Sequence, residues 1–405
     1  MILGPISILD CAVFCLLLAP QLILQAGLFD TVACVLNCLP FLLLQLPYEF
    51  IRDQAFAKSA HVSPFTRQAP LFEDFVNRCV RFAFANIPAH IGRVFLSKEV
   101  SLPFLRYRML RHGYLRPPVH WREHRGRGFH GIWIAADPNK RPDVVVYYMH
   151  GGGFSMGSGH FYLEFLVVWH SLLRESGFQN PSIFILEYTL VPKACYPTQL
   201  EEAIHGYEHA VSMAGQASNV VVAGDSAGGN LSLSLMLHIG RHDASENTEI
   251  PNQTARPQKP GMAVLISPWV TLITDENKNT SSDYLNAEAL KMYGLQYVGD
   301  ANRHDPLVSP GCCQDANWWR RASPSKELFL IYGEEEIFAP EARRFKKMLQ
   351  DFGINARSHK EPSAVHAWPV VSIYLSGDQK KRLKGLRLIV DEIRGRMSQD
   401  NIVKI

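Results

Sequence analysis

The sequence Val220-Val-Val-Ala-Gly-Asp-Ser-Ala-Gly-Gly229 places a strand-like run of β-branched residues directly before a glycine-rich turn. Within it, Gly224-Asp225-Ser226-Ala227-Gly228 has the form G-x-S-x-G, and a helical pattern follows from Asn230 to Gly240. A serine on a sharp turn between a strand and a helix has its hydroxyl raised clear of the sheet, and the helix N-terminus favours developing negative charge. Ordinary turns made of glycine and serine are not preceded by a strand and followed by a helix in this way. We therefore predict that Ser226 is a nucleophile.

A second glycine-rich segment, His150-Gly151-Gly152-Gly153-Phe154, follows the apolar run 144–149 and precedes Ser226. Because glycines carry no side chains, such a loop can turn several backbone N–H groups toward one point. Donors of this kind stabilise the oxyanion of a tetrahedral intermediate by ~3–4 kcal/mol each. We predict an oxyanion hole formed by the N–H groups of Gly152, Gly153 and Ala227.

A serine hydroxyl is a poor nucleophile near pH 7, so a base must take its proton and an acid must orient that base. With the chain order Ser, acid, His, the acid candidates are Glu334, Glu335 and Glu336, which follow the strand-like run 328–332. His366 comes late enough in the chain to be the base. At most one of the three glutamates can orient the imidazole, and the residues alone leave that choice open.

From Asp143 onward, strand-like and helical patterns alternate along the chain. Such alternation is typical of a parallel sheet whose strands are joined by crossover helices. The predicted strands are 144–149, 182–188, 219–223, 262–266, 328–332 and 356–360, and the predicted helices are 200–214, 230–240 and 341–352. The polar segment 243–261 is typical of a surface loop. The predicted fold class is α/β, with a mostly parallel central sheet flanked by helices.

The N-terminal region is apolar and has no basic residue before Arg52. Its two apolar stretches, 6–26 and 28–46, each have about the length that spans a bilayer. We predict a membrane anchor of one or two helices within residues 1–50 that is dispensable for the chemistry; the alternative is a hairpin buried in the protein or lying on the membrane surface. Further domain boundaries are expected as follows: a lead-in and part of a cap at 51–113, the catalytic domain at 114–405, and a cap insertion at about 272–303.

Composition narrows the classes of partner and cofactor. A net charge of +3 and 47% hydrophobic residues indicate a folded, nearly neutral protein and argue against a nucleic-acid partner. The eight cysteines have neither zinc-ligand spacing nor the pattern of a disulfide framework, so we expect no metal and no cofactor. We interpret the basic residues between Arg106 and Arg127 as the solvated face of edge strands; the alternative is a membrane-surface or anionic-substrate role.

Two signals bear on the side of the membrane. Basic residues follow the apolar region, which by the positive-inside rule favours a cytosolic catalytic domain. Sequons at Asn252 and Asn279 are glycosylation candidates, and glycans there would instead indicate the lumen. Asn230 also forms a sequon, but we expect it to be too buried for modification. We predict attachment to the endoplasmic reticulum or another endomembrane, with the side of the catalytic domain open.

Together these motifs resemble the hormone-sensitive-lipase-like branch of the α/β hydrolases, over roughly His150 to Pro369. Two further segments, Glu187-Tyr-Thr-Leu-Val-Pro192 and Asp305-Pro-Leu-Val-Ser-Pro310, are similar to segments of that family. The resemblance implies a helical cap and an acid three residues after the glycine that ends its strand, which is Glu336. Most members have aspartate there, so the glutamate is a departure. With its apolar N-terminus, the architecture is similar to membrane-anchored steryl acetyl hydrolases and to fungal secondary-metabolite hydrolases.

The sequence thus predicts a membrane-attached serine hydrolase that cleaves a hydrophobic small-molecule ester through Ser226, His366 and Glu336. Lipid, sterol or secondary-metabolite chemistry is the expected setting. The same triad suits an acyltransferase or an amide or lactone hydrolase. A non-catalytic small-molecule-binding protein of the same fold is the alternative from another class; retention of Ser226, His366 and the glycine loop argues against it.

Overall fold

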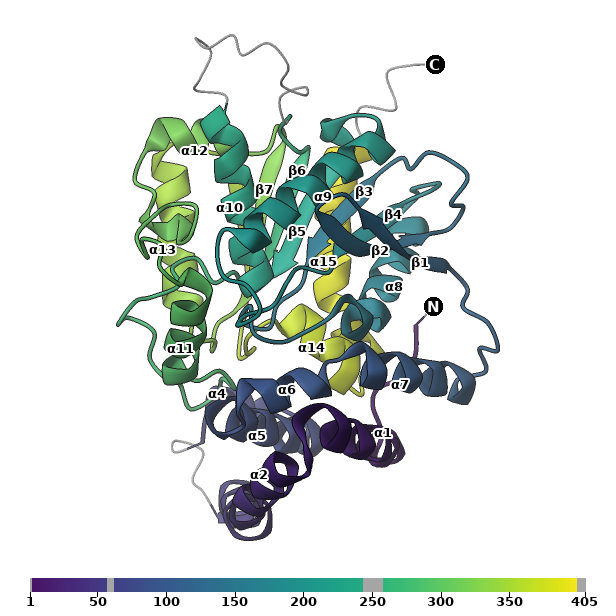
Figure 1. Cartoon of the computed structure of the whole chain (residues 1–405), viewed down its shortest axis with the longest axis vertical. Helices are drawn as coiled ribbons and strands as arrows, with labels where there is room; N and C mark the ends of the chain where they lie inside the picture. The colour runs from purple at the N-terminus through teal and green to yellow at the C-terminus, as the bar shows by residue number, and fades with distance from the viewer. Residues whose placement is uncertain (1, 57–61, 243–257, 399–405) are drawn as a thin grey trace.

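The computed structural model describes residues 2–56, 62–242 and 258–398, and its centre is a twisted sheet with helices on both faces (Figure 1). In this described part, eight strands form one sheet in the order β1-β2-β4-β3-β5-β6-β7-β8. The pairs β1–β2 and β2–β4 are antiparallel, and all later neighbours are parallel. The strands are β1 (His120–Gly126), β2 (Phe129–Ala135), β3 (Val145–Met149), β4 (Ser182–Leu186), β5 (Val220–Asp225), β6 (Met262–Ile266), β7 (Glu327–Gly333) and β8 (Ala356–Glu361). The predicted α/β fold with a mostly parallel sheet is confirmed.

Two helix layers cover the sheet because successive side chains of a strand point to opposite faces. In β3, Tyr147 belongs to a core cluster that includes residues of α9 (Thr198–Ala214), α10 (Ala227–His242) and α13 (Ala339–Asp351). Its neighbour Tyr148 belongs to the cluster with residues of α8 (Gly159–Glu175) and α15 (Gln379–Met397). Both tyrosines are fully buried. The helices of the two layers and their connections are α8 (Gly159–Glu175), α9 (Thr198–Ala214), α10 (Ala227–His242), α12 (Ala316–Ala322), α13 (Ala339–Asp351), α14 (Trp368–Leu375) and α15 (Gln379–Met397), with short 3₁₀ turns at Ala217–Asn219 and Pro310–Cys312.

The N-terminal helices pack across the end of the sheet where the parallel strands terminate (Figure 1). They are α1 (Ile8–Ala26), α2 (Leu28–Pro40), α3 (Leu46–Ile51), α4 (Pro64–Gln68), α5 (Leu71–Asn86), α6 (Ala89–Phe95) and α7 (Lys98–Arg111), with π-helical turns at Phe41–Gln45 and Arg52–Phe56. Helix α11 (Ala287–Val298) lies beside α5. These elements cover the carboxyl ends of β3, β5, β6 and β7, where the predicted site residues lie.

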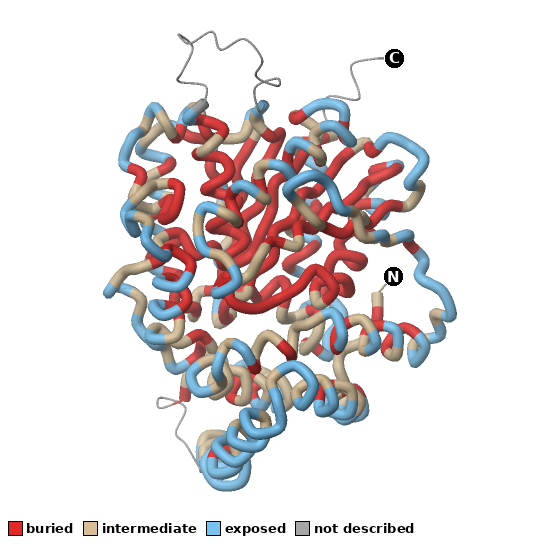
Figure 2. The backbone as a smooth tube through the Cα atoms, viewed as in Figure 1, coloured by how far each residue is buried: buried red, intermediate tan, exposed pale blue. Residues whose placement is uncertain are grey.

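Two N-terminal helical stretches are long and apolar enough to cross a membrane: Ile8–Ala26 and Leu28–Gln54. Only 11% and 6% of their most apolar windows are buried inside the protein, so most of this apolar surface is exposed. In Figure 2 these helices are mostly pale blue and tan, whereas the central strands of the sheet are red. The apolar stretches predicted at 6–26 and 28–46 therefore correspond to helices whose surface is mostly not covered by the rest of the chain.

The basic residues between Arg106 and Arg127 were expected on the solvated face of edge strands. This expectation is wrong for the first half of that stretch. Arg106, Arg108 and Arg111 lie on helix α7 and not on an edge strand, and Arg108 is fully buried. Its guanidinium is paired with carboxylates, which compensates the cost of removing the charge from water. Arg122 and Arg125 do lie exposed on the edge strand β1, as predicted. The predicted surface loop at 243–261 falls mostly, and Asn252 falls entirely, outside the described residues.

Candidate active site

Ser226 stands at the sharp turn between β5 and α10, with a positive φ of 52°. Its N–H donates to the carbonyl of Ile266 at 3.0 Å and its carbonyl accepts from the N–H of Trp269 at 3.0 Å, which fixes this left-handed conformation. The turn needs glycine at position 228, because a Cβ there would lie 2.0 Å from the carbonyl oxygen of Met149. The local sequence thus folds into a turn that presents the serine at the carboxyl end of the sheet.

The glycine loop after β3 lies beside this serine. Gly152 has a φ of 112°, and a Cβ at this position would meet the carbonyl oxygen of Met156 at 2.1 Å. Among the described residues, the N–H groups of Gly152, Gly153 and Ala227 donate no hydrogen bond. Gly152 and Gly153 line the same cavity as Ser226. The N–H groups of Gly152 and Gly153 are therefore available to a ligand in that cavity, whereas Ala227 is buried and is not among the lining residues.

Asp225 connects the glycine loop to the turn that carries Ser226. It is buried, and its carboxylate accepts hydrogen bonds from the N–H of Gly151 at 2.8 Å, from Tyr148 Oη at 2.6 Å and from Tyr162 Oη at 2.8 Å. Burial raises the pKa of this carboxyl, while the hydrogen bonds from the two tyrosines act in the opposite direction. His150 stacks on Tyr188 with ring centroids 4.3 Å apart. Through these contacts, the motif residues His150, Gly151 and Asp225 hold the glycine loop after β3 in place.

His366 lines the same cavity as Ser226, and both His366 and its neighbour Glu336 are buried. Nδ1 of His366 is 3.8 Å from Oε2 of Glu336, and within the described chain neither this nitrogen nor Oε1 of Glu336 has a hydrogen-bond partner. Oε2 accepts from Ser267 Oγ at 2.5 Å and from the N–H of Gly333 at 3.1 Å. Burial lowers the pKa of His366 to about 3 and raises the pKa of Glu336 well above its ordinary value, because it disfavours the charged form of each group.

The other two glutamates point elsewhere. The carboxylate of Glu334 pairs with Lys360 in a half-exposed ion pair. The carboxylate of Glu335 accepts from Ser282 Oγ at 3.1 Å, and its carbonyl accepts from Thr280 Oγ1 at 3.0 Å. Of the three candidates, Glu336 is the one that the structure brings next to His366.

Asp283 is a buried acid near this pair that the sequence analysis did not single out. Its carboxylate accepts from the backbone N–H of His366 at 3.1 Å, of Ile337 at 2.8 Å and of Tyr284 at 2.9 Å. Burial raises its pKa to about 6, against the effect of these N–H donors. Asp283 thereby joins the loop that carries the histidine to the turn that carries Glu336. No local motif marks it, since it lies 83 positions from His366.

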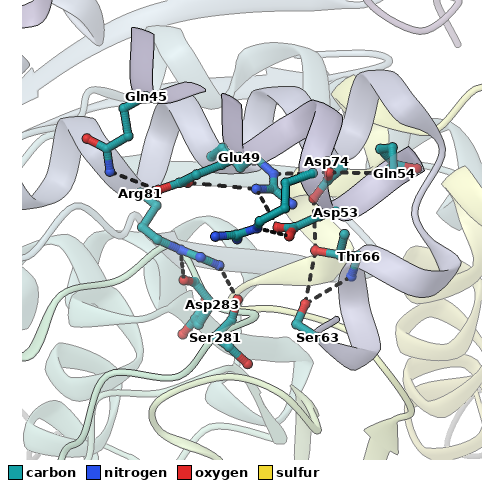
Figure 3. A network of polar contacts seen from close by, with 12 residues as sticks. Gln45, Glu49, Asp53, Gln54, Ser63, Thr66, Asp74, Arg81, Ser281 and Asp283 are labelled. Carbon is teal, nitrogen blue, oxygen red and sulfur yellow. Dashed lines mark hydrogen bonds and ion pairs between the residues drawn. The ribbon is translucent and has the colours of Figure 1, made fainter. Parts of the chain in front are cut away.

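Polar contacts connect the Asp283 segment to the N-terminal helices (Figure 3). Arg81 of α5 donates to the carbonyls of Asp283 and Ser281, both at 2.8 Å. One turn away, Arg78 pairs with Asp74 at 3.1 Å and with Asp53 at 3.0 Å. Helix α5 therefore holds the 281–283 segment on one side and the end of the apolar N-terminal region on the other.

A cavity of about 430 Å³ connects these parts, and it is lined by Ser226, His366, Gly152 and Gly153 together with mostly apolar side chains. The apolar lining comes from several elements: Phe72, Val76, Val80 and Phe84 of α5, Phe104 and Leu105 of α7, Leu290 and Tyr293 of α11, and Val370 and Tyr374 of α14. The described residues contain no group of three or more His, Cys, Asp or Glu side chains arranged to hold a metal ion. The arrangement places a serine hydroxyl, a histidine imidazole and two glycines of one loop in the lining of a largely apolar cavity.

The sequence matches the protein family described as alpha/beta hydrolase fold over residues 146–370, more than half of the chain. The chain belongs to this family. Among solved structures, this α/β hydrolase is similar to a hormone-sensitive lipase from a metagenome library, with a TM-score of 0.61 and 20% identity over 80% of this chain and 98% of that one. An esterase from the bacterial hormone-sensitive lipase family gives a TM-score of 0.58, with 21% identity over 81% of this chain and 99% of that one. At these identities the likeness shows the fold.

Curated relatives of this α/β hydrolase include proteins named for acetyl-ester chemistry. Steryl acetyl hydrolase 1 of Saccharomyces cerevisiae is 24% identical over 63% of this chain and 60% of its own length. A Schizosaccharomyces pombe protein, also named a steryl acetyl hydrolase, is 28% identical over 52% of this chain and 55% of its own length. An acetyl-hydrolase of Streptomyces hygroscopicus is 23% identical over 58% of this chain and 71% of its own length. The matched region thus spans little more than half the length of the two yeast relatives.

Proposed function

We propose that this α/β hydrolase is a carboxylic ester hydrolase that acts through Ser226, His366 and Glu336. The observation that carries the proposal is one cavity lined by Ser226, His366 and two glycines whose N–H groups donate to no other described residue, with Glu336 next to the histidine. This combination provides every group that acyl transfer to a serine requires.

In the first step Ser226 Oγ attacks the ester carbonyl carbon and His366 takes the serine proton. The carbonyl oxygen becomes an oxyanion, which the N–H groups of Gly152, Gly153 and Ala227 stabilise. The buried carboxylate of Glu336 stabilises the imidazolium that forms and holds its tautomer. His366 then gives the proton to the leaving alcohol oxygen as the carbon–oxygen bond breaks, leaving an acyl-enzyme.

In the second step a water molecule attacks the acyl carbon and His366 takes one of its protons. The collapse of this second tetrahedral intermediate expels Ser226 Oγ, which regains its proton from His366, and releases the carboxylic acid. Acyl transfer to an alcohol would follow the same path with the alcohol in place of water, so the triad alone does not distinguish the two reactions.

The apolar lining of the cavity supports a hydrophobic ester as substrate. The names of the relatives support acetyl esters of sterol-like or other apolar alcohols, in lipid or secondary-metabolite chemistry. The exposed apolar helices α1 and α2 support attachment to an endomembrane. Asn279 is exposed and Asn230 is fully buried, so occupancy of the Asn279 sequon in a membrane preparation tests whether the catalytic domain faces the lumen.

Replacement of Ser226 with alanine tests the proposal. We expect S226A to lose hydrolysis of p-nitrophenyl acetate and labelling by a fluorophosphonate probe while its melting temperature stays near that of the wild type. The matched control is S234A, which removes a buried serine hydroxyl from the same helix α10 outside the cavity lining. Turnover by S226A at the rate of S234A would show that another residue is the nucleophile.

A further inference from the structure

The wall of the active-site cavity includes the apolar N-terminal helix. Cys11, Phe14 and Cys15 of α1, together with Ile6 just before it, line the same cavity as Ser226 and His366. A chain segment that served only as a remote anchor would not contribute to this lining. Helix α1 thus contacts the space in which a substrate of the proposed hydrolase would lie.

A buried cluster of charges holds the start of α1 in place. Asp10 and Arg108 are both fully buried, and their ion pair measures 3.1 Å. Arg108 also binds Glu164 of α8 at 2.7 Å and the carbonyl of Gly4 at 2.6 Å, and Arg111 pairs with Asp10 at 3.2 Å. A carboxylate and a guanidinium removed from water are tolerated only when they are paired with good geometry. The cluster therefore specifies one position for α1 against the catalytic domain.

Apolar packing continues this contact along the helix. Leu18 is buried against Val94 and Val100, with Phe14 and Leu22 packed on the same cluster. The rings of Phe14 and Phe104 meet edge to face, with centroids 5.2 Å apart. The opposite face of α1 is apolar but uncovered: Ile8, Leu16 and Leu24 are 82%, 73% and 77% exposed. One face of α1 is thus docked on the protein, and the other is available to lipid.

We propose that helix α1, docked by the Asp10–Arg108–Glu164 cluster, is a wall of the substrate cavity and determines which esters the enzyme accepts. This proposal rests on the proposed function, and it replaces the expectation that the N-terminal region is dispensable for the chemistry. The same helix presents one face to the membrane and one to the cavity, so the apolar body of the ester lies against α1, α5 and α7. The substrate class is an ester with a long or polycyclic apolar group, taken up from the lipid phase.

Adjacent residues of α1 allow a matched test in the full-length protein. Both Cys15 and its neighbour Leu16 are exposed, but only Cys15 also lines the cavity. We compare C15W with L16W by the ratio of kcat/KM for decyl acetate to that for ethyl acetate, in detergent micelles. We expect C15W to lower this ratio at least tenfold and L16W to change it less than twofold. Equal ratios in C15W and the wild type, or equal losses in both variants, would overturn the proposal.

A second measurement does not depend on catalysis. The rate at which N-ethylmaleimide modifies Cys15 is followed by peptide mass spectrometry, with and without a decyl ether that has the shape of the ester but no carbonyl. We expect the ether to slow modification of Cys15 at least fivefold, and an unchanged rate would overturn the proposal. Protection of Cys15 in a protein that fails to react with a fluorophosphonate would support the cavity wall and overturn the proposed hydrolase, so the two failures are distinguishable.

Discussion

The loops around Ser226 and the N-terminal helices form the two sides of one cavity, yet they are specified in different ways. The side that carries Ser226 is specified by short sequence motifs. There the strand β5, a glycine-containing turn and the helix α10 follow one another directly along the chain. The N-terminal side depends on contacts between distant residues, such as Asp10 with Arg108 and Arg81 with Ser281. The chemistry is therefore local in sequence, whereas the shape of the space that receives the substrate is not. Substitutions on each side, and at Asp283 between them, test this difference.

The largest effect is expected from the acid on the catalytic side. Glu336→Gln removes the carboxylate that faces Nδ1 of His366, so we expect kcat to fall more than about 10²-fold, as for loss of the orienting acid in other triads. Glu334→Gln and Glu335→Gln should each stay within about tenfold, because their carboxylates point away from the histidine. Steady-state kinetics on p-nitrophenyl acetate measure this. Equal small effects of all three substitutions would place the acid elsewhere.

On the N-terminal side, Asp10→Ala should act on stability. The substitution leaves Arg108 with one carboxylate partner fewer in a fully buried position, so we expect the free energy of unfolding to fall by ~3 kcal/mol. Asp30→Ala is the control, because the side chain of Asp30 is 63% exposed. Chemical unfolding in detergent compares the two variants. If both unfold like the wild type, α1 is not held by its buried charge cluster.

Asp283 lies where the two sides meet, and its removal should have a smaller effect. Asp283→Asn places an amide donor opposite backbone N–H groups that now donate to a carboxylate. We expect kcat to fall about tenfold with KM nearly unchanged, because the loops of His366 and Glu336 lose their common acceptor while the cavity stays intact. Asp275→Asn, at an exposed site, is the control. A change in KM alone would assign Asp283 to substrate binding and not to positioning.

The smallest effect is a shift in the pH profile. Burial lowers the pKa of His366 to about 3, below the ordinary value of 6.5, and only the neutral imidazole can take the serine proton. As the pH falls, the base therefore stays neutral to lower values than an exposed histidine would. We expect the acid limb of kcat/KM to have its midpoint below pH 6.5. A midpoint at or above 6.5 would mean that the histidine is charged more easily than its burial implies.

The fold could be predicted from the sequence because its signals are local. Strand β3 was predicted at 144–149 and is observed at Val145–Met149, and the strand predicted at 219–223 is β5, Val220–Asp225. Alternating apolar runs and glycine turns report burial and backbone conformation directly, without reference to the rest of the chain. The same reasoning failed for Arg108, because charge in a sequence does not report whether a carboxylate lies opposite.

By itself the sequence determined the α/β fold, the candidate nucleophile Ser226 and the order in which the acid and the histidine follow it along the chain. The family resemblance of the sequence already favoured Glu336 among the three glutamates. The role of Asp283 and the presence of α1 in the cavity wall were decided only by the tertiary structure. The physical reason is separation along the chain. Turn geometry and strand burial depend on neighbouring residues, whereas a buried ion pair or a cavity wall depends on which distant surfaces the packed core brings together.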